Sequence, residues 1–481
     1  MTLVGYYGLI LSKVPSGIPG FDDMVCGGIP AGSLILLAGN PGTGKTVFSA
    51  RFLYSGASEY GEHGVYVSFA ESREDFYRNM RSFGFDFERL ELEGKFKFLD
   101  LFTMREEGVP MMLDLVIREA YALDARRMVV DSFSALAQAF ERPVEARIFL
   151  HTLLNKLVKE KRCTTLLITE TPTGVEKIGL GIEEFVADGV IVFLRLEYEQ
   201  RLLRELHVLK FRGSEISRHM SVFTLKEGFK VFTPISNREI AHPKKFVPIP
   251  HSKEYFSSGI EDLDKLIAGR LRAGTYSLVD VGRDVAFPLI RLIRPTIINF
   301  ISQGHGVAIL PPRGASAPRI REYLVHYIGD EALMRQVRVV DFPQRFDAQA
   351  PYILELSGNS IEDDMRKFWS TIREFKETTS KPILSVVGFD SLEYMYGYKE
   401  VLKILGRDIA FTRNYGDVRV NVIRPNIGVA EHLRAVSDLS LRVEEIGGCL
   451  FLWGVKPMTG IYSFDIVHRD GVSAVKFMPV V

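Results

Sequence analysis

Gly39-Asn40-Pro41-Gly42-Thr43-Gly44-Lys45-Thr46 directly follows the apolar run Ser33-Leu-Ile-Leu-Leu-Ala38. The spacing G-x-x-x-x-G-K-T between a strand and a helix is typical of a phosphate-binding loop. Its glycines permit a tight path on which successive backbone N–H groups face phosphate oxygens. Lys45 is expected to reach the β- and γ-phosphates, and the Thr46 hydroxyl to bind Mg²⁺. The following helix, roughly 46–57, would present its positive end to the anion. These eight residues therefore predict a nucleotide site.

Composition sets the outer limits of the interpretation. A chain of 481 residues is too long for one core, and two to three domains are expected. Lys and Arg balance Asp and Glu at 60 each, so whole-chain charge favours neither nucleic acid nor a membrane surface as partner. Cys26, Cys163 and Cys449 are too scattered for a zinc site or a disulfide framework, and a cytoplasmic setting is expected. No apolar run approaches the length of a membrane span, and the run 3–11 is interpreted as an opening strand rather than a signal peptide.

Short β-rich runs alternate with amphipathic helical stretches along the first half of the chain. Strands are expected at 34–38, 64–69, 96–99, 127–130, 164–169 and 189–196, and helices at 73–83, 109–123, 141–161 and 181–187. Such alternation predicts an α/β fold with a mostly parallel sheet and helices on both faces. Ligands bind at the carboxyl ends of the strands in this fold, and the phosphate-binding loop lies at that end of its strand.

An internal repeat divides the chain into two domains. The polar, Pro-rich segment 236–255 is interpreted as a linker between a first domain, 1–235, and a second, 256–481. Pro15-Ser-Gly-Ile-Pro-Gly-Phe-Asp22 returns as Ser257-Ser-Gly-Ile-Glu-Asp-Leu-Asp264, an offset of 242 residues. The block that starts at Gly27 and ends at Ser33 returns at the same offset.

The second copy does not reproduce the loop. After Tyr276-Ser-Leu-Val-Asp280 the chain reads Val281-Gly-Arg-Asp-Val-Ala-Phe287, which contains no G-K-T. It offers no lysine for phosphates and no hydroxyl for Mg²⁺. The second domain is therefore expected to have the same fold as the first but no nucleotide site.

Two acidic residues are candidates for the chemistry beside the loop. Asp131 ends the apolar run Met128-Val-Val130, where a carboxylate can order Mg²⁺ through water or simply cap a turn, and we favour the Mg²⁺ role. Glu71 follows the predicted strand 64–69 and is the best candidate for the general base that activates water. A helix N-terminal Glu favoured by the dipole is an equal interpretation from spacing alone.

Two cations stand late in the first domain, in the segment Lys210-Phe-Arg212-Gly213-Ser214. Lys210 and Arg212 share one face of a predicted strand that ends at Gly213. Cations at strand spacing are usually a solvated face, but they can equally act as fingers that reach the γ-phosphate of a neighbouring subunit.

Taken together, these motifs resemble the KaiC-like branch of the RecA-type ATPases over residues 11–225. The resemblance rests on the ordered set 17–22, 31–33, 39–46, 69–72, 129–132, 181–188 and 210–214. The second half resembles the same domain in decayed form, and archaeal tandem proteins of the GvpD and KaiC type are the nearest in character. The resemblance implies two tandem RecA-like P-loop NTPase domains, with ATP and Mg²⁺ as ligands, and a homo-oligomeric ring, commonly a hexamer.

The resemblance also assigns roles to residues. It implies that Lys210 and Arg212 act across the subunit interface and that Glu71 is the base, while Glu184 and Asp188 are interpreted as packing and capping residues. Family members often carry paired glutamates where this chain has Ala70 and Glu71, so slow hydrolysis is expected. In the second domain, a segment that ends in Asp390 resembles that of Asp131, Asp438 parallels Asp188, and Lys456 remains at the cation position. Without a loop there, autokinase activity is not expected.

Three functions follow from these observations. The leading hypothesis is a regulatory, signal-transduction type ATPase that hydrolyses ATP slowly, with the second domain as a scaffold or readout for an unidentified protein partner. An alternative is a RecA-type accessory ATPase that binds DNA in recombination or repair, which the balanced charge does not favour. A third is a nucleotide-dependent binding protein that never hydrolyses ATP.

Overall fold

In the computed structural model, the apolar run before the loop is strand β3 (Leu34–Gly39), and all six of its residues are buried. It lies inside a nine-stranded sheet in the order β11-β10-β9-β8-β3-β7-β6-β4-β5. The other strands of this sheet are β4 (Gly64–Ser68), β5 (Phe96–Asp100), β6 (Arg127–Asp131), β7 (Thr164–Glu170), β8 (Gly189–Tyr198), β9 (Arg201–Phe211), β10 (Met220–Thr224) and β11 (Lys230–Val231). A separate pair is β1 (Lys13–Val14) with β2 (Ile29–Pro30).

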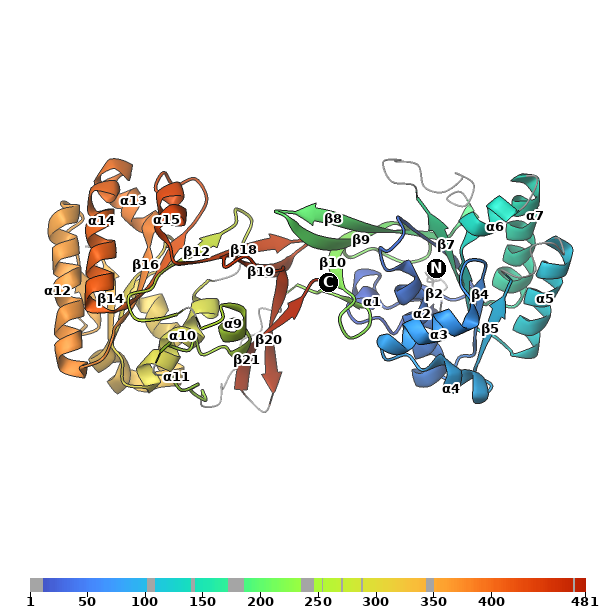
Figure 1. Ribbon diagram of the computed structural model, residues 1–481, viewed down its shortest axis with the longest axis horizontal. Coiled ribbons are helices and arrows are strands. Elements are labelled where there is room, and N and C mark those ends of the chain that lie inside the picture. Colours follow the sequence, from blue (N-terminus) through green and yellow to red (C-terminus); the bar gives the residue numbers. More distant parts are fainter. Residues whose placement is uncertain are drawn as a thin grey trace, which may run out of the picture. The chain divides into compact units, whose positions relative to one another are not determined.

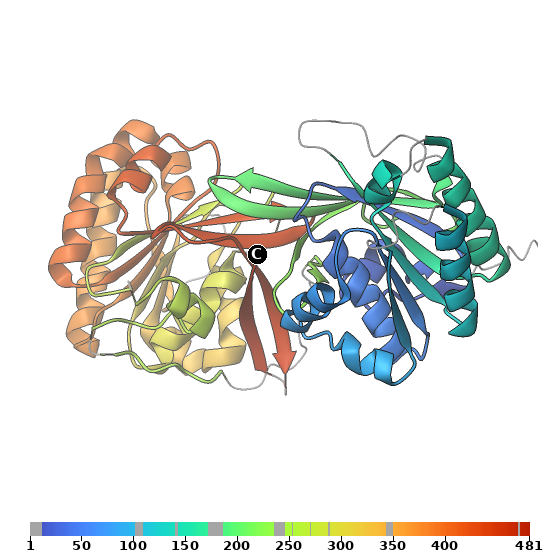
Figure 2. The ribbon, with the colours of Figure 1, turned by 45° about the vertical axis from the view of Figure 1, so that its right-hand side comes forward.

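The structure describes residues 12–101, 109–139, 143–171, 186–234, 246–252, 254–269, 271–286, 289–342, 350–469 and 472–481. The chain divides into two units. The first comprises Met1–Pro234, Gly447–Cys449 and Pro479–Val481, and the second comprises Ile235–Ile446 and Leu450–Met478. Both units are drawn in Figures 1 and 2.

The sheet of the first unit separates two hydrophobic cores. Strand β3 pairs in parallel with β7 and β8, so alternate side chains point to opposite faces. Leu34 and Leu36 join one core, and Ile35 and Leu37 join the other. A strand buried on both faces explains why this run is continuously apolar rather than alternating.

Helices cover both faces (Figure 1). One core receives side chains of α2 (Lys45–Glu59), α3 (Arg73–Ser82) and α4 (Phe87–Leu92), and the other receives side chains of α5 (Val109–Ala122), α6 (Phe133–Ala139) and α7 (Pro143–Leu153). A short helix, α1 (Phe21–Met24), precedes β2. Ser72 begins α3 as its N-cap, because its hydroxyl accepts the N–H of Asp75 at 3.2 Å. The expected α/β class is confirmed, with antiparallel strands only at the β9–β11 edge of this sheet among the described pairings.

Three sequence expectations need comment. The predicted helix at 141–161 is split, because α7 passes into a π-helix, η1 (Leu154–Glu160). The strand predicted for Lys210 and Arg212 ends at Phe211, so Arg212 lies just beyond it. The opening strand at 3–11, most of the helix at 181–187 and Glu184 lie outside the described residues.

The second unit repeats the strand order of the first. Its sheet runs β15-β14-β13-β16-β17-β12-β18-β19-β20-β21. The strands are β12 (Tyr276–Val281), β13 (Val307–Leu310), β14 (Val337–Asp341), β15 (Ile353–Glu355), β16 (Leu384–Gly388), β17 (Val418–Ile423), β18 (Leu439–Ile446), β19 (Cys449–Lys456), β20 (Tyr462–Arg469) and β21 (Val472–Pro479). Reading β12 as β3, β13 as β4, β14 as β5, β16 as β6, β17 as β7 and β18 as β8 reproduces the core order without a permutation. The tandem α/β architecture is therefore present in both units.

Two cores flank this second sheet as well. One contains side chains of α9 (Glu261–Leu266), α10 (Ile290–Ser302) and α11 (Ala317–Gln336), and the other contains side chains of α12 (Ile361–Thr379), α13 (Phe389–Tyr396), α14 (Tyr398–Tyr415) and α15 (Ala430–Val436). None of the helices in the described part of the chain is both long and apolar enough to cross a membrane.

The repeat extends to single hydrogen bonds. Asp188 accepts the N–H of Leu34 at 3.1 Å, and Asp438 accepts that of Tyr276, its counterpart, at 2.9 Å. Asp22 accepts the N–H of Ser16, and Asp264 accepts that of Ser258 in the same way. In each unit, one carboxylate thus accepts the backbone N–H at the start of the central strand, and another accepts a backbone N–H in the loop before it. This arrangement agrees with the capping role expected for Asp188.

Candidate nucleotide site

The loop after β3 has the backbone path that its glycines predict. Gly39 has φ of 153°, and a Cβ there would lie 2.4 Å from the carbonyl oxygen of Phe193 in β8. Gly44, with φ of 104°, is the N-cap of α2. The first hydrogen bond of that helix runs from the Phe48 N–H to the Gly44 carbonyl at 3.0 Å. The N–H groups ahead of it have no carbonyl to meet inside the helix, so they form a donor surface at its positive end.

Lys45 is held against this loop. Its side chain is buried, and Nζ donates to the carbonyls of Gly39 at 2.7 Å and Asn40 at 2.8 Å. Burial lowers the pKa of Lys45, while the carboxylates of Asp131 and Glu170 act in the opposite sense. Two of the three ammonium hydrogens are donated to loop carbonyls, and the third can be donated to a phosphate bound in the same loop.

Thr46 and Asp131 meet at the carboxyl end of β6. Thr46 Oγ1 donates to Asp131 Oδ2 at 2.9 Å, although 85 residues separate them in the chain. Tyr66, in β4, donates its hydroxyl to the same carboxylate oxygen at 2.5 Å. Burial raises the pKa of Asp131, whereas the hydrogen bonds from Tyr66 and Thr46 and the charge of Lys45 lower it. The structure therefore joins the hydroxyl and the carboxylate that the sequence suggested as one cation site.

Glu71 lies in the loop between β4 and α3. Because Ser68 pairs with Asp131 across the two parallel strands, this loop leaves the sheet beside Asp131. Desolvation raises the pKa of Glu71, a hydrogen bond from Asn79 Nδ2 at 2.6 Å opposes the rise, and the negative charge of Asp131 adds to it. The carboxylate thus stands near the predicted cation site without being bonded to it.

Three residues at the site escaped the sequence interpretation. Tyr66 was part of an apolar strand, where a tyrosine is expected to belong to the core. Glu170 ends β7 opposite Gly39, and its charge acts on both Lys45 and Asp131. An acidic residue that ends a buried strand was the signal that could have found it. Arg204, in β9, donates from Nη1 to the Gly42 carbonyl at 3.0 Å, a contact that depends on the β8–β9 hairpin and has no sequence signature.

Lys210 and Arg212 lie at the opposite end of the strands from the phosphate-binding loop. Strand β8 runs parallel to β3, with Phe193 level with Gly39. Lys210 pairs with Val190, at the amino-terminal start of β8, and its Nζ donates to the Ala187 carbonyl at 2.7 Å. Arg212 is exposed, two residues farther from the loop. These cations are therefore directed away from the nucleotide site of their own chain.

Comparisons with known proteins agree with this geometry. The family model described as KaiC matches residues 14–235, and the model described as GvpD basic region 2 matches residues 245–342. The circadian clock oscillator protein KaiC of Synechococcus elongatus is 34% identical over 272 residues, which cover 54% of this chain and 50% of that protein. The circadian clock protein KaiC2 of Synechocystis sp. is 32% identical over 282 residues, which cover 57% of this chain and 48% of that protein.

One solved structure is similar to part of this chain. The KaiC-like protein from Pyrococcus horikoshii OT3 is 40% identical, with a TM-score of 0.43, and the match covers 46% of this chain and 100% of that one. The chain spans about half the length of the curated relatives that it matches.

Proposed function

Through residues 14–235 the chain belongs to the KaiC-like RecA-superfamily ATPases, and on this premise we propose that it is a regulatory ATPase that binds Mg-ATP and hydrolyses it slowly. The first domain, residues 1–235, carries the chemistry. The segment 236–255 is a linker, and residues 256–481 read out the nucleotide state. The observation that carries the proposal is the hydrogen bond of 2.9 Å between the side chains of Thr46 and Asp131. Thr46 directly follows Lys45, which is bound to the loop at the start of α2.

The donor set fits a nucleotide with a hard divalent cation. Thr46 Oγ1 and the Asp131 carboxylate are oxygen ligands of the kind that Mg²⁺ prefers, with the remaining positions supplied by phosphates and water. The bond between them holds both oxygens on one side of the loop. Mg²⁺ held by Thr46 and Asp131 would supply positive charge that offsets the charge of the phosphates.

The residues of the chain divide the work of hydrolysis. Lys45 and the N–H groups at the start of α2 hold the phosphates. Glu71 orients the attacking water and accepts its proton, for which its raised pKa suits it. A single carboxylate, with Ala70 beside it, supports a slow reaction.

The positions of Lys210 and Arg212, at the opposite end of the strands from the loop, support assembly of several subunits. Gly39 pairs with Phe193 of β8, and Lys210 pairs with Val190 of the same strand. Val190 lies three residues, or about 10 Å, before Phe193 along β8, on the side away from the loop. Arg212 lies farther still, so neither cation serves the nucleotide of its own chain. We propose that both reach the γ-phosphate of a neighbouring subunit in a homo-oligomeric ring and offset the charge of the transition state there.

Phosphate release measures the proposed activity. Wild-type protein should release phosphate from ATP, Lys45→Ala should lose both binding and release, and Glu71→Gln should bind ATP without releasing phosphate. Lys95→Ala, which removes an exposed lysine paired with Glu93, is the matched control and should behave as wild type. Equal rates for wild type and Lys45→Ala would refute the ATPase.

Two further outcomes would redirect the proposal. ATP binding without any release in the wild type would leave a nucleotide-dependent binding protein. A shift of single-stranded DNA in a gel, strengthened by ATP and weakened by salt, would instead favour the DNA-binding alternative.

Light scattering with a non-hydrolysable ATP analogue tests the ring. A monomer both with and without the analogue would remove the role of Arg212 in a neighbour's site.

A further inference from the structure

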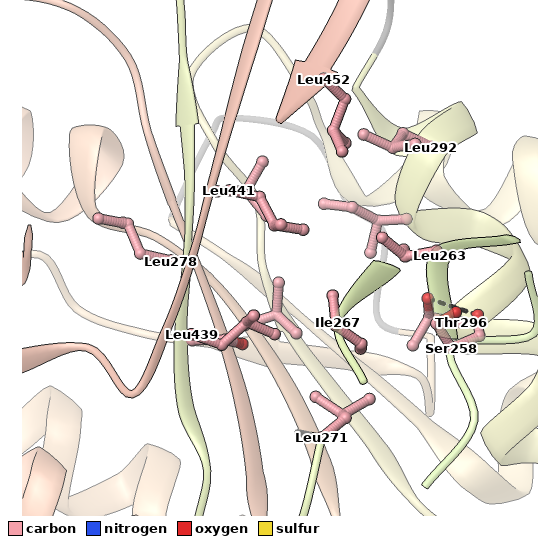
Figure 3. Close-up of a pocket in the computed structure, with 14 residues that line it drawn as sticks. Ser258, Leu263, Ile267, Leu271, Leu278, Leu292, Thr296, Leu439, Leu441 and Leu452 are labelled. Carbon is pink, nitrogen blue, oxygen red and sulfur yellow. Dashed lines mark hydrogen bonds between the residues drawn. The ribbon is translucent and has the colours of Figure 1, made fainter. Parts of the chain in front are cut away.

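Two of the cavities in the second unit differ in character. One, of about 50 Å³, is lined almost entirely by aliphatic side chains, among them Leu263, Leu278 and Leu441 (Figure 3). Its few polar groups are engaged, since Thr296 Oγ1 donates to the Ser258 carbonyl at 2.8 Å. A space of this size and lining suits a packing void rather than an organic ligand.

The other cavity, of about 270 Å³, approaches the lower end of small-molecule pockets, roughly 300 Å³. It is lined by residues that follow the parallel strands β12, β13 and β17 at their carboxyl ends, including Ala286, Arg313 and Arg424. This edge of a parallel α/β sheet is where such folds bind ligands. The cavity therefore lies where the first unit has its nucleotide site.

Strand register identifies the matching positions. Leu34 pairs with Thr165 in the first unit, and its counterpart Tyr276 pairs with Arg419 in the second. Five residues on, Gly39 stands opposite Glu170, so the position that matches Glu170 is Arg424. The acidic end of β7 has become a basic one at the end of β17.

The carboxylate of the cation site is also gone. Counted through the same register, the position that matches Asp131 is Gly388, and Asp390 lies two residues beyond it, in α13. A Cβ on Gly388 would lie 2.4 Å from Cα of Pro312, so backbone fills the space that a carboxylate would need. The sequence interpretation that aligned Asp390 with Asp131 is wrong by two residues for this reason.

Three arginines now line the cavity, Arg313, Arg319 and Arg424. Nε of Arg424 is buried and has no hydrogen-bond partner within the part of the chain that the structure describes, with the Asp390 carboxylate 3.9 Å away. Arg319 is exposed in the first turn of α11, and the guanidinium of Arg313 lies 4.4 Å from the ring centre of Tyr394. Asp390 accepts the backbone N–H of Arg313 at 3.1 Å, and Arg424 is the arginine whose side chain pairs with this carboxylate.

Apolar side chains also line this cavity. Leu289, Ile290 and Ile320 line it, with Tyr323 as the aromatic side chain. A ligand that contacts both the arginines and these apolar side chains has an anionic group joined to an uncharged, apolar or aromatic body. Guanidinium groups bind phosphate through paired N–H donors, and this binding requires no metal.

We propose that the second domain binds a small organic phosphate, without a divalent cation, in the cavity that replaces its lost nucleotide site. Arg319 and Arg424 hold the phosphate, and the side chains of Leu289, Ile290 and Ile320 receive the body of the ligand. The second domain would then be a sensor with a ligand of its own rather than a scaffold alone.

Titration calorimetry of the full chain in EDTA tests this site, with phenyl phosphate as the probe. Wild type and Lys45→Ala should bind it with Kd below about 1 mM. Arg319→Gln and Arg424→Gln should each weaken binding at least about tenfold. Arg366→Gln, which removes an exposed arginine of α12 paired with Asp363, should not. Inorganic phosphate and benzyl alcohol, which carry one feature each, should bind at least about tenfold more weakly than phenyl phosphate.

Four results would overturn the proposal. They are the absence of saturable binding, binding that Lys45→Ala abolishes, binding that survives Arg319→Gln, and equal affinity for phenyl phosphate and inorganic phosphate. Arg319 is exposed, so its substitution tests the site even where Arg424→Gln lowers stability. Because Lys45→Ala removes the first site, failure here is distinct from failure of the proposed ATPase.

Discussion

The hydroxyl of Tyr66 donates a hydrogen bond to Oδ2 of Asp131 at 2.5 Å, the same oxygen that accepts from Thr46. Tyr66 is buried, and its ring stacks on Phe98 at a centroid distance of 5.5 Å. Desolvation and the charge of Asp131 hold the pKa of the phenol well above its usual value, so it stays protonated and donates. A buried tyrosine on a neighbouring strand thus fixes one oxygen of the proposed cation site.

Tyr66→Phe keeps the ring and removes this bond. Because the bond lowers the pKa of Asp131, its loss should raise that pKa and weaken Mg²⁺-dependent activity most strongly at acidic pH. Mg²⁺ titrations of phosphate release at two pH values measure the effect, with at least about a threefold greater loss expected at the lower pH. Tyr77→Phe removes a similar bond to Glu91, away from the loop, and should leave both titrations unchanged.

Thr46→Val replaces a hydroxyl by a methyl group of similar size. It should lower kcat/KM for ATP by about 10²-fold, or about 2.7 kcal/mol, since it removes an oxygen of the cation site. Thr46→Ser retains the hydroxyl and should keep activity within about fivefold of wild type. Similar losses for the two variants would show that packing, not the hydroxyl, matters at this position.

The acid limb of the pH–rate profile should report Glu71. Its pKa is raised above the ordinary 4.5, chiefly by desolvation, and a general base works only when deprotonated. Activity should therefore fall as pH drops through a value above 4.5. Asn79→Ala removes a hydrogen bond that lowers this pKa, so the limb should move to higher pH, whereas the exposed Glu74→Ala should not move it. An unchanged limb in Asn79→Ala would contradict the assignment of Glu71.

Subunit mixing tests the action of Arg212 in a neighbouring site. Lys45→Ala lacks a working loop but keeps its cations, and Arg212→Gln has the converse defect. Each alone should be nearly inactive, and a mixture should recover activity, because some interfaces then combine an intact loop with an intact Arg212. A mixture of Lys45→Ala with the double variant Lys45→Ala/Arg212→Gln should stay inactive. No recovery in the first mixture would refute action across the interface.

Arg204 should position the loop rather than act on the substrate. Its Nη1 bonds the Gly42 carbonyl at 3.0 Å, so Arg204→Gln should raise KM for ATP severalfold and leave kcat within about twofold. The cross-strand neighbour Arg195 is exposed, and Arg195→Gln is the matched control. A loss confined to kcat would instead assign Arg204 a role in the chemical step.

The loop, the α/β class and the tandem repeat could all be predicted from the sequence, because each rests on local spacing. Glycines at 39, 42 and 44 specify a backbone path, and the offset of 242 residues exposes the second copy. Glu71 and Asp131 are predicted as site residues in the same way, as acidic residues that follow buried strands. Glu170 could have been found by the same signal.

Tertiary structure decided what strand pairing brings together. Tyr66 reaches Asp131 only because β4 pairs with β6, and Arg204 reaches Gly42 only because β9 folds back along β8. Strand direction likewise separates Lys210 and Arg212 from the loop of their own chain. Register shows Gly388, not Asp390, to match Asp131, and so reveals an arginine-lined cavity where the second copy lost its loop. Local residue chemistry predicts which groups a segment offers, but pairing and register are non-local, and they determine which groups meet.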